Sequence, residues 1–179
     1  MKKFEYTPPE QPRELILKLG QKITDRIGHT VTAEDPEYYG LEALVTDEMA
    51  EVALKMKVRK PMTLAQIVKA TGKEEKALEE LLQEMSNIGL LEYNWENPKH
   101  EKQYVLPMYV PGSAEFFNMK LDQIKEHPEV ASFFERMAFL PLQKVTPMVP
   151  PGGAGIGMHV IPVEKAIETE NESVSVEHI

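Results

Sequence analysis

The chain has 179 residues, is 42% hydrophobic and 27% charged, and carries a formal net charge of −9 at pH 7. This composition is typical of a folded domain and excludes a wholly disordered chain. No apolar run reaches the roughly 18 residues that a transmembrane helix needs, and no apolar segment follows Lys2 and Lys3, so a secretory signal is not indicated. We therefore expect a cytoplasmic protein without a membrane partner.

The content of cysteine, histidine and charged residues excludes or disfavours several kinds of functional site. Cysteine is absent, which excludes disulfides, thiol catalysis and cysteine-ligated metals within this chain. The five histidines lie far apart and show no zinc-site spacing, so no metal site is expected. The acidic balance disfavours a general nucleic-acid binder, because phosphate contacts need clustered lysine and arginine.

Residues 1–45 form an expected N-terminal extension with one helix. Apolar residues recur at helical spacing from Leu15 to Ile27, and Gly28 can end such a helix. Segment 29–45 contains threonine, proline and glycine and is expected to be mainly a connecting segment between helices.

Three further helices are expected in residues 46–89. Thr46 can cap the first, Thr63–Gln66 has the form of a capping box for the second, and Thr71–Glu74 has the same form for the third. Gly89 can supply the left-handed C-terminal cap of the third helix. One face of that helix carries the apolar residues Ala77, Leu78, Leu81, Leu82, Met85 and Ile88.

After Gly89 the spacing of the apolar residues changes from about 3.6 residues to 2 residues, which is the signature of a strand. Leu91, Tyr93 and Trp95 alternate with polar residues, and 103–106 forms a return strand after a polar turn. The predicted elements follow one another as helix, short helix, longer helix and two-stranded hairpin. This is the order found in a winged helix-turn-helix. We predict a mainly α (α+β) fold with this motif at 46–110.

Residues 111–140 are expected to form two helices rich in phenylalanine. Ser113 can cap the first, and Pro128 can start the second. These helices either pack on the motif or provide an interface for a homodimer or a protein partner. The candidate interface residues are Phe116, Phe117, Phe133, Phe134 and Met137.

Residues 141–179 are expected to be a proline- and glycine-rich linker followed by an acidic tail. The stretch PPGGAGIG invites comparison with a nucleotide-binding loop. A dinucleotide fingerprint needs glycines at relative positions one, three and six after a strand, and no start at Gly152, Gly153 or Gly155 satisfies this. A Walker loop needs a lysine that is absent here. The stretch therefore predicts a linker rather than a ligand site.

DNA binding is the alternative that the motif raises. The third helix would enter the major groove, but its outer face carries Glu74, Glu75, Glu79, Glu80 and Glu84, which would repel phosphate. The basic residues before the second helix either contact a phosphate backbone or complement the negative end of their own helix. The candidate DNA contacts are Lys55, Lys57, Arg59, Lys60, Lys73, Lys76, Gln83, Lys99 and Lys102.

No catalytic motif accompanies these elements. There is no nucleophile elbow and no HExxH sequence, and the many glutamates fall at solvated helix positions. We therefore expect a protein that is not an enzyme.

Three stretches together resemble a known family: TLAQIVKATGKEEKALEELLQEMSNIGLLEY, then YVLPMYVPGSAEFFNM, then GMHVIPVEKAIE. They resemble the N-terminal winged-helix region of bacterial and archaeal [4Fe–4S] ferredoxin-type proteins, across about residues 46–170. The more specific parts are LPxYVPGxxEF and IPVEKAI. In that family, cysteine ligands of the CxxCxxCxxxC type follow downstream. None occurs here, so the clusters are expected only in a C-terminal domain that this sequence does not contain, either because it is a piece of a longer protein or because that domain is lacking.

The resemblance implies a non-catalytic interaction or regulatory module of an electron-transfer protein, acting by docking to a protein or by dimerisation. The alternative is a winged-helix DNA-binding transcriptional regulator. No cofactor is expected within this chain.

Overall fold

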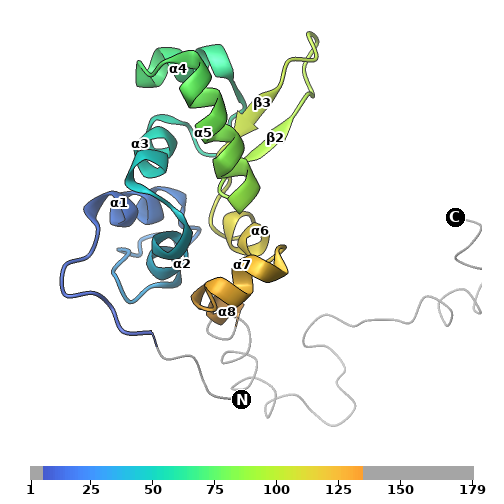
Figure 1. Cartoon of the computed structure of the whole chain (residues 1–179). Coiled ribbons are helices and arrows are strands. Elements are labelled where there is room, and N and C mark those ends of the chain that lie inside the picture. The colour runs from blue at the N-terminus through green and yellow to red at the C-terminus, as the bar shows by residue number, and fades with distance from the viewer. Residues whose placement is uncertain (1–5, 135–179) are drawn as a thin grey trace, which may run out of the picture. The chain divides into compact units, whose positions relative to one another are not determined.

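The computed structural model describes residues 6–134, which lie in the first of two compact units, Met1–Leu140 and Pro141–Ile179. Within the described residues the chain forms eight helices and one three-stranded antiparallel sheet (Figure 1). The predicted mainly α fold with a small β component is therefore confirmed. The expected linker and acidic tail, 141–179, lie outside the described residues.

The first helix, α1 (Glu14–Ile23), is shorter than its apolar pattern suggests. The prediction that it continues to Ile27 and ends at Gly28 is wrong, since Ile27 is fully exposed. A tertiary hydrogen bond explains the early end. The Ile23 carbonyl, which would accept from the N–H four residues on in a longer helix, accepts from the backbone N–H of Tyr109 at 2.7 Å.

The segment predicted as connection, 29–45, contains a second helix, α2 (Pro36–Leu44). Pro36 occupies the first turn, where its missing N–H costs nothing. The helix is buried continuously from Pro36 to Leu41, which is most of its length. Because no exposed polar face alternates with a buried one there, the apolar residues do not recur at helical spacing. That is why periodicity failed to reveal α2.

Helices α3 (Asp47–Lys55), α4 (Leu64–Thr71) and α5 (Glu75–Ile88) follow as expected. The Thr46 side chain accepts from the Met49 N–H, and the capping box at Thr63 is present. Gly89 ends α5 in the left-handed conformation. These local predictions are confirmed.

The start of α5 differs from its prediction. Thr71 does not cap it but belongs to α4, where its hydroxyl donates to the Ile67 carbonyl. The cap is Glu74, whose carboxylate accepts from the N–H groups of Lys76 and Ala77. Of the face predicted to be apolar, Leu78, Leu82 and Met85 are buried, whereas Ala77 is exposed.

The sheet has three strands rather than the two predicted. A short strand, β1 (Met62–Thr63), lies between α3 and α4 and pairs with β3 (Gln103–Val105). β3 also pairs with β2 (Glu92–Asn94), so the order is β1-β3-β2 and β2 is an edge strand. The β2–β3 hairpin projects beyond the helices at the upper right of Figure 1. Two residues are too few for alternation to identify a strand, so β1 left no sequence signal.

The helix predicted from Ser113 to His127 is two short helices, α6 (Ser113–Phe117) and α7 (Leu121–Glu126). Gly112, not Ser113, holds the cap position of α6. The Asn118 side-chain amide, just after α6, donates to the carbonyls of Ala114 and Val130. These bonds connect the end of α6 to the last described helix, and α6 ends at this point. That helix, α8 (Glu129–Phe134), begins directly after Pro128.

One core joins these elements. α1 packs on α2 and α3, and α2 also packs on α8. The N-terminal helices therefore belong to the same core as residues 46–110. Within residues 6–134 no helix is long and apolar enough to cross a membrane.

Candidate functional site

The basic cluster at the end of α3 and in the loop before β1 is exposed. Arg59 adopts a left-handed conformation, with φ at 58°, and its N–H donates to the Leu106 carbonyl at 2.8 Å. This bond anchors the loop to the end of the sheet and leaves the charged groups on the outside. None of the four basic side chains of the cluster makes an ion pair with another residue of the 6–134 region. The cluster consists of Lys55, Lys57, Arg59 and Lys60.

The other candidate DNA contacts are placed less favourably. Lys73 is held in an ion pair with Glu48 at 2.6 Å. Lys76 and Gln83 are on α5, beside the glutamates of that helix. The predicted repulsive face is present, because Glu75, Glu79, Glu80 and Glu84 are all exposed. Lys99 is exposed in the β2–β3 turn.

Lys102 lies against aromatic rings. Its ammonium nitrogen is 4.5 Å from the centre of the Tyr93 ring and 4.9 Å from that of Tyr104. It also donates to Oε1 of Gln83 at 3.0 Å. These contacts bind the lysine to the hairpin and to α5, so reaching a phosphate would require giving up cation–π attraction.

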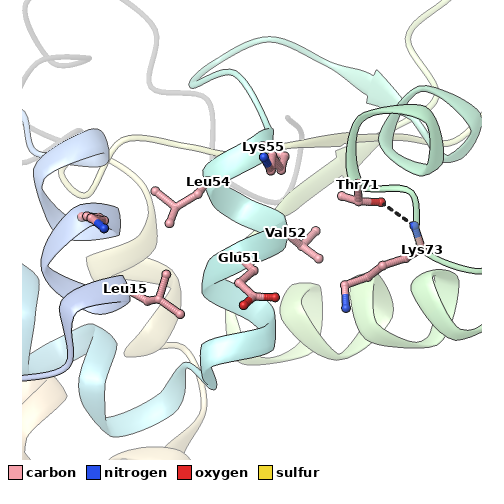
Figure 2. Close-up of a pocket in the computed structure, with 8 residues that line it drawn as sticks. Leu15, Glu51, Val52, Leu54, Lys55, Thr71 and Lys73 are labelled. Atoms are coloured by element: carbon pink, nitrogen blue, oxygen red, sulfur yellow. Dashed lines mark hydrogen bonds between the residues drawn. The ribbon is translucent and has the colours of Figure 1, made fainter.

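A first surface hollow of about 400 Å³ lies between α1, α3 and the end of α4. Figure 2 shows Leu15 and Leu54 on the side of α1, with Thr71 and Lys73 on the opposite side. Its charges are largely balanced: Lys18 pairs with Glu14 at 2.6 Å, and Lys73 pairs with Glu48.

A second hollow, of about 530 Å³, lies beside the edge strand β2, and we call it the β2 groove. Its walls come from the end of α5, from β2, and from α6 with the turn after it. Gly89 forms part of the floor, where a Cβ atom would lie only 2.7 Å from Cβ of Phe116. The residues of the β2 groove are Ser86, Asn87, Gly89, Leu91, Glu92, Tyr93, Phe116, Met119 and Lys120.

Large apolar side chains are exposed at and near this groove. Tyr93 is 45% exposed and Met119 is 76% exposed within it. Trp95, 51% exposed, stands edge-on to Tyr93 with ring centres 5.4 Å apart. Leu121, which follows the groove residue Lys120 in the chain, is 66% exposed. We call Tyr93, Trp95, Met119 and Leu121 the apolar strip.

The predicted phenylalanine interface is only partly present. Phe117 is buried in the core, where its ring lies 6.5 Å from that of Tyr109, so it is not available for an interface. Phe116 is half-buried in the β2 groove, and Phe134 is exposed at the end of α8. The side chain of Phe133 and all of Met137 lie outside the described part.

Sequence reasoning missed the apolar strip as a surface feature. Tyr93 and Trp95 were assigned to a strand but not to an exposed face. A signal did exist, since residues two apart on a strand share a face and the turn of the hairpin contains no large apolar residue that could cover them. Met119 and Leu121 gave no such signal, because they lie in the stretch expected to form a single helix.

In the region 6–134, no group of three or more histidine, aspartate or glutamate residues is placed to hold a metal ion. The [4Fe–4S] clusters that the resemblance implies are held by cysteine thiolates. The chain has no cysteine, so its residues do not fit such a group.

The described residues thus define a helix-rich protein with a small three-stranded sheet and an apolar surface groove. No family model, curated protein or solved structure matches the chain.

Proposed function

We propose that residues 46–110 form a winged helix-turn-helix and that the chain is a non-catalytic docking module, binding another protein through the β2 groove. The order α3, β1, α4, α5, β2, β3 supports the motif, with β1 tying the hairpin to the helices. The resemblance to ferredoxin-type proteins supports a cytoplasmic electron-transfer system as the setting.

The observation that carries the docking function is the exposed apolar strip. Isolated exposed apolar residues are normal, but Tyr93 and Met119 line the same groove and Trp95 contacts Tyr93, which favours a binding surface. Tyr93 and Trp95 are aromatic residues of the kind that dominate binding energy at protein interfaces. The edge position of β2 adds backbone groups that no neighbouring strand of the described sheet covers.

DNA binding is the second candidate, favoured by the exposed cluster at Lys55, Lys57, Arg59 and Lys60. Against it stand the acidic face of α5 and the engagement of Lys73 and Lys102 in other contacts. Both features remove positive charge from the elements that this motif offers to the major groove.

The docking function is tested by placing a photo-crosslinking amino acid at Tyr93 in cells that express the chain. We expect a discrete crosslinked protein that disappears when Met119→Ser is added, because serine removes apolar contact from the groove. The matched control carries the same crosslinker at Ile27, an exposed apolar residue elsewhere. Equal crosslinking from both positions would contradict the docking function.

The DNA alternative is tested by fluorescence polarisation with duplex DNA at low salt. A DNA-binding module would bind with a steep salt slope, and Lys57→Gln and Arg59→Gln would reduce that slope. We expect no saturable binding, since the acidic face of α5 opposes it.

A further inference from the structure

We infer that the occupant of the β2 groove is a basic amphipathic segment of a partner protein. Its apolar side chains would cover the apolar strip, and its lysines or arginines would face the carboxylates around the groove. This inference rests on the proposed docking function and adds the chemistry of the partner.

The groove supplies the apolar part of this recognition. A hollow of about 530 Å³ lies within the range of clefts that hold ligand-sized groups. Tyr93 and Met119 are both exposed within it, and Leu91 and Phe116 complete the apolar walls. Covering such side chains releases ordered water and favours binding in proportion to the area buried.

Three carboxylates without an ion pair lie in the groove or on the helix that borders it, among the described residues. Glu92 lies in the groove itself and is exposed. Glu84 lies three residues before the groove residue Asn87 on α5, and Glu80 lies one turn further back, so the two extend the acidic surface along the exposed face of the helix. None of these three carboxylates makes an ion pair with another residue in the described range. Two basic groups lie on the same surface: Lys120 lines the groove, and the Lys102 ammonium lies over the ring of the groove residue Tyr93. The three carboxylates outnumber them.

The aromatic rings favour a cationic partner for a second reason. The Tyr93 ring already has the chain's own Lys102 ammonium 4.5 Å from its centre. Trp95, edge-on to Tyr93 and half exposed, offers a further ring to an arginine or lysine of the partner. Tryptophan is the strongest cation–π acceptor among the side chains.

The same charges argue against a second copy in a symmetric dimer. In a two-fold contact the same patch lies on both sides of the interface, so the unpaired carboxylates of Glu80, Glu84 and Glu92 would all be present twice in one interface. Like charges across an interface suppress association. A partner segment of opposite sign meets no such repulsion.

Trp95 makes the test direct, because it is the only tryptophan of the chain. The full chain is titrated with a short peptide that alternates lysine and leucine, and Trp95 emission is followed. The comparison peptides alternate glutamate with leucine and lysine with serine. We expect saturable binding of the lysine–leucine peptide, weakened by salt, and at least about tenfold weaker binding of the other two.

Substitutions of exposed residues test whether the peptide binds at the groove. Glu92→Gln together with Glu84→Gln, and separately Met119→Ser, should each weaken the lysine–leucine peptide by about tenfold. The matched controls Glu51→Gln and Ile27→Ser change an exposed carboxylate and an exposed apolar residue elsewhere and should leave binding unchanged. Circular dichroism verifies that each variant keeps its helix content.

The outcomes separate this inference from the function on which it rests. If Tyr93 crosslinks to a partner but the glutamate–leucine peptide binds as well as the lysine–leucine one, docking stands and the basic partner is wrong. The basic partner is likewise wrong if Glu51→Gln weakens binding as much as the paired Glu92 and Glu84 change. If light scattering instead reveals a dimer that Met119→Ser dissociates, the occupant is a second copy and the inference is wrong. If Tyr93 crosslinks no more than Ile27, both proposals fail.

Discussion

The Tyr109 hydroxyl donates a hydrogen bond to the Pro36 carbonyl at 2.7 Å, joining residues 73 positions apart. The tyrosine is fully buried, and burial raises the pKa of its hydroxyl well above the ordinary value, so it remains a donor. Its oxygen lies against Gly40 so closely that a Cβ atom there would collide with it. This contact fixes the first turns of α2 to the segment that follows β3.

Gly40→Ala and Tyr109→Phe are therefore expected to couple. Alone, Gly40→Ala should cost about 1–3 kcal/mol, because the added methyl overpacks against the hydroxyl. With Tyr109→Phe the oxygen is gone and the nearest remaining ring atom is 3.4 Å away. In that background Gly40→Ala should be close to neutral, helped by the roughly 1 kcal/mol better helix propensity of alanine.

Urea unfolding of the four proteins in this double-mutant cycle measures the coupling. Tyr109→Phe alone should cost about 1 kcal/mol for the lost hydrogen bond. Strictly additive free energies of unfolding would show that the hydroxyl does not limit the space at Gly40.

Arg26→Met should be strongly destabilising. The Arg26 guanidinium bonds to both Asp35 and Glu37, and the Glu37 side chain is only 2% exposed. Removing the cation leaves a buried carboxylate with no opposite charge, which costs about 3–5 kcal/mol. The matched control Lys18→Met breaks the exposed pair with Glu14 and should cost no more than about 1 kcal/mol. Similar shifts in the urea midpoint for both variants would contradict this account.

Asp35 should make the protein sensitive to acid. Burial opposes its ionisation, but hydrogen bonds from Thr32 and the Arg26 guanidinium outweigh burial and hold its pKa well below the ordinary value. Since the pKa in the unfolded chain is about 3.9, the charged form stabilises the fold above about pH 5, and this stabilisation is lost as the pH falls below about 4.

The measurement is the urea midpoint at a series of pH values. Asp35→Asn, which cannot titrate, should lose less stability than the wild type between about pH 5 and pH 2. The exposed Asp122→Asn variant should parallel the wild type. Parallel curves for all three proteins would rule out Asp35 as a source of acid sensitivity.

Gly89→Ala should cost more than Gly72→Ala. Both glycines end helices in the left-handed region, with φ of 94° and 71°, so alanine strains the backbone at each by about 1–2 kcal/mol. A Cβ at Gly72 meets nothing within 4 Å, whereas at Gly89 it lies 2.8 Å from the Phe116 carbonyl carbon. That backbone contact should add about 1–3 kcal/mol. Equal losses of unfolding free energy in the two variants would show that α6 can move away.

Features that depend on neighbouring residues were predictable from the sequence. The cap at Thr46, the capping box at Thr63 and the left-handed Gly89 each involve atoms only a few residues apart. The β2–β3 hairpin was predictable because its apolar period and turn residues are also local. The predicted capping box at Thr71–Glu74 was wrong, although it too involves residues only a few positions apart. Gly72 ends α4 after Thr71, and the carboxylate of Glu74 caps α5 instead.

Features that depend on distant partners were not predictable. α1 ends at Ile23 because the N–H of Tyr109 takes its carbonyl. The candidate site needed the same long-range information. The sequence contains Tyr93, Trp95 and Met119, but only packing determines that these stay exposed while Phe117 is buried.

By itself the sequence determined the helix caps at Thr46 and Thr63, the α5 stripe, the hairpin and the acidic outer face of α5, since these follow from spacing along one element. Tertiary structure decided which apolar side chains form the core and which form the β2 groove, and it placed Gly89 against Phe116. The physical reason is that burial is shared among elements: a side chain is covered only when a segment distant in sequence packs over it.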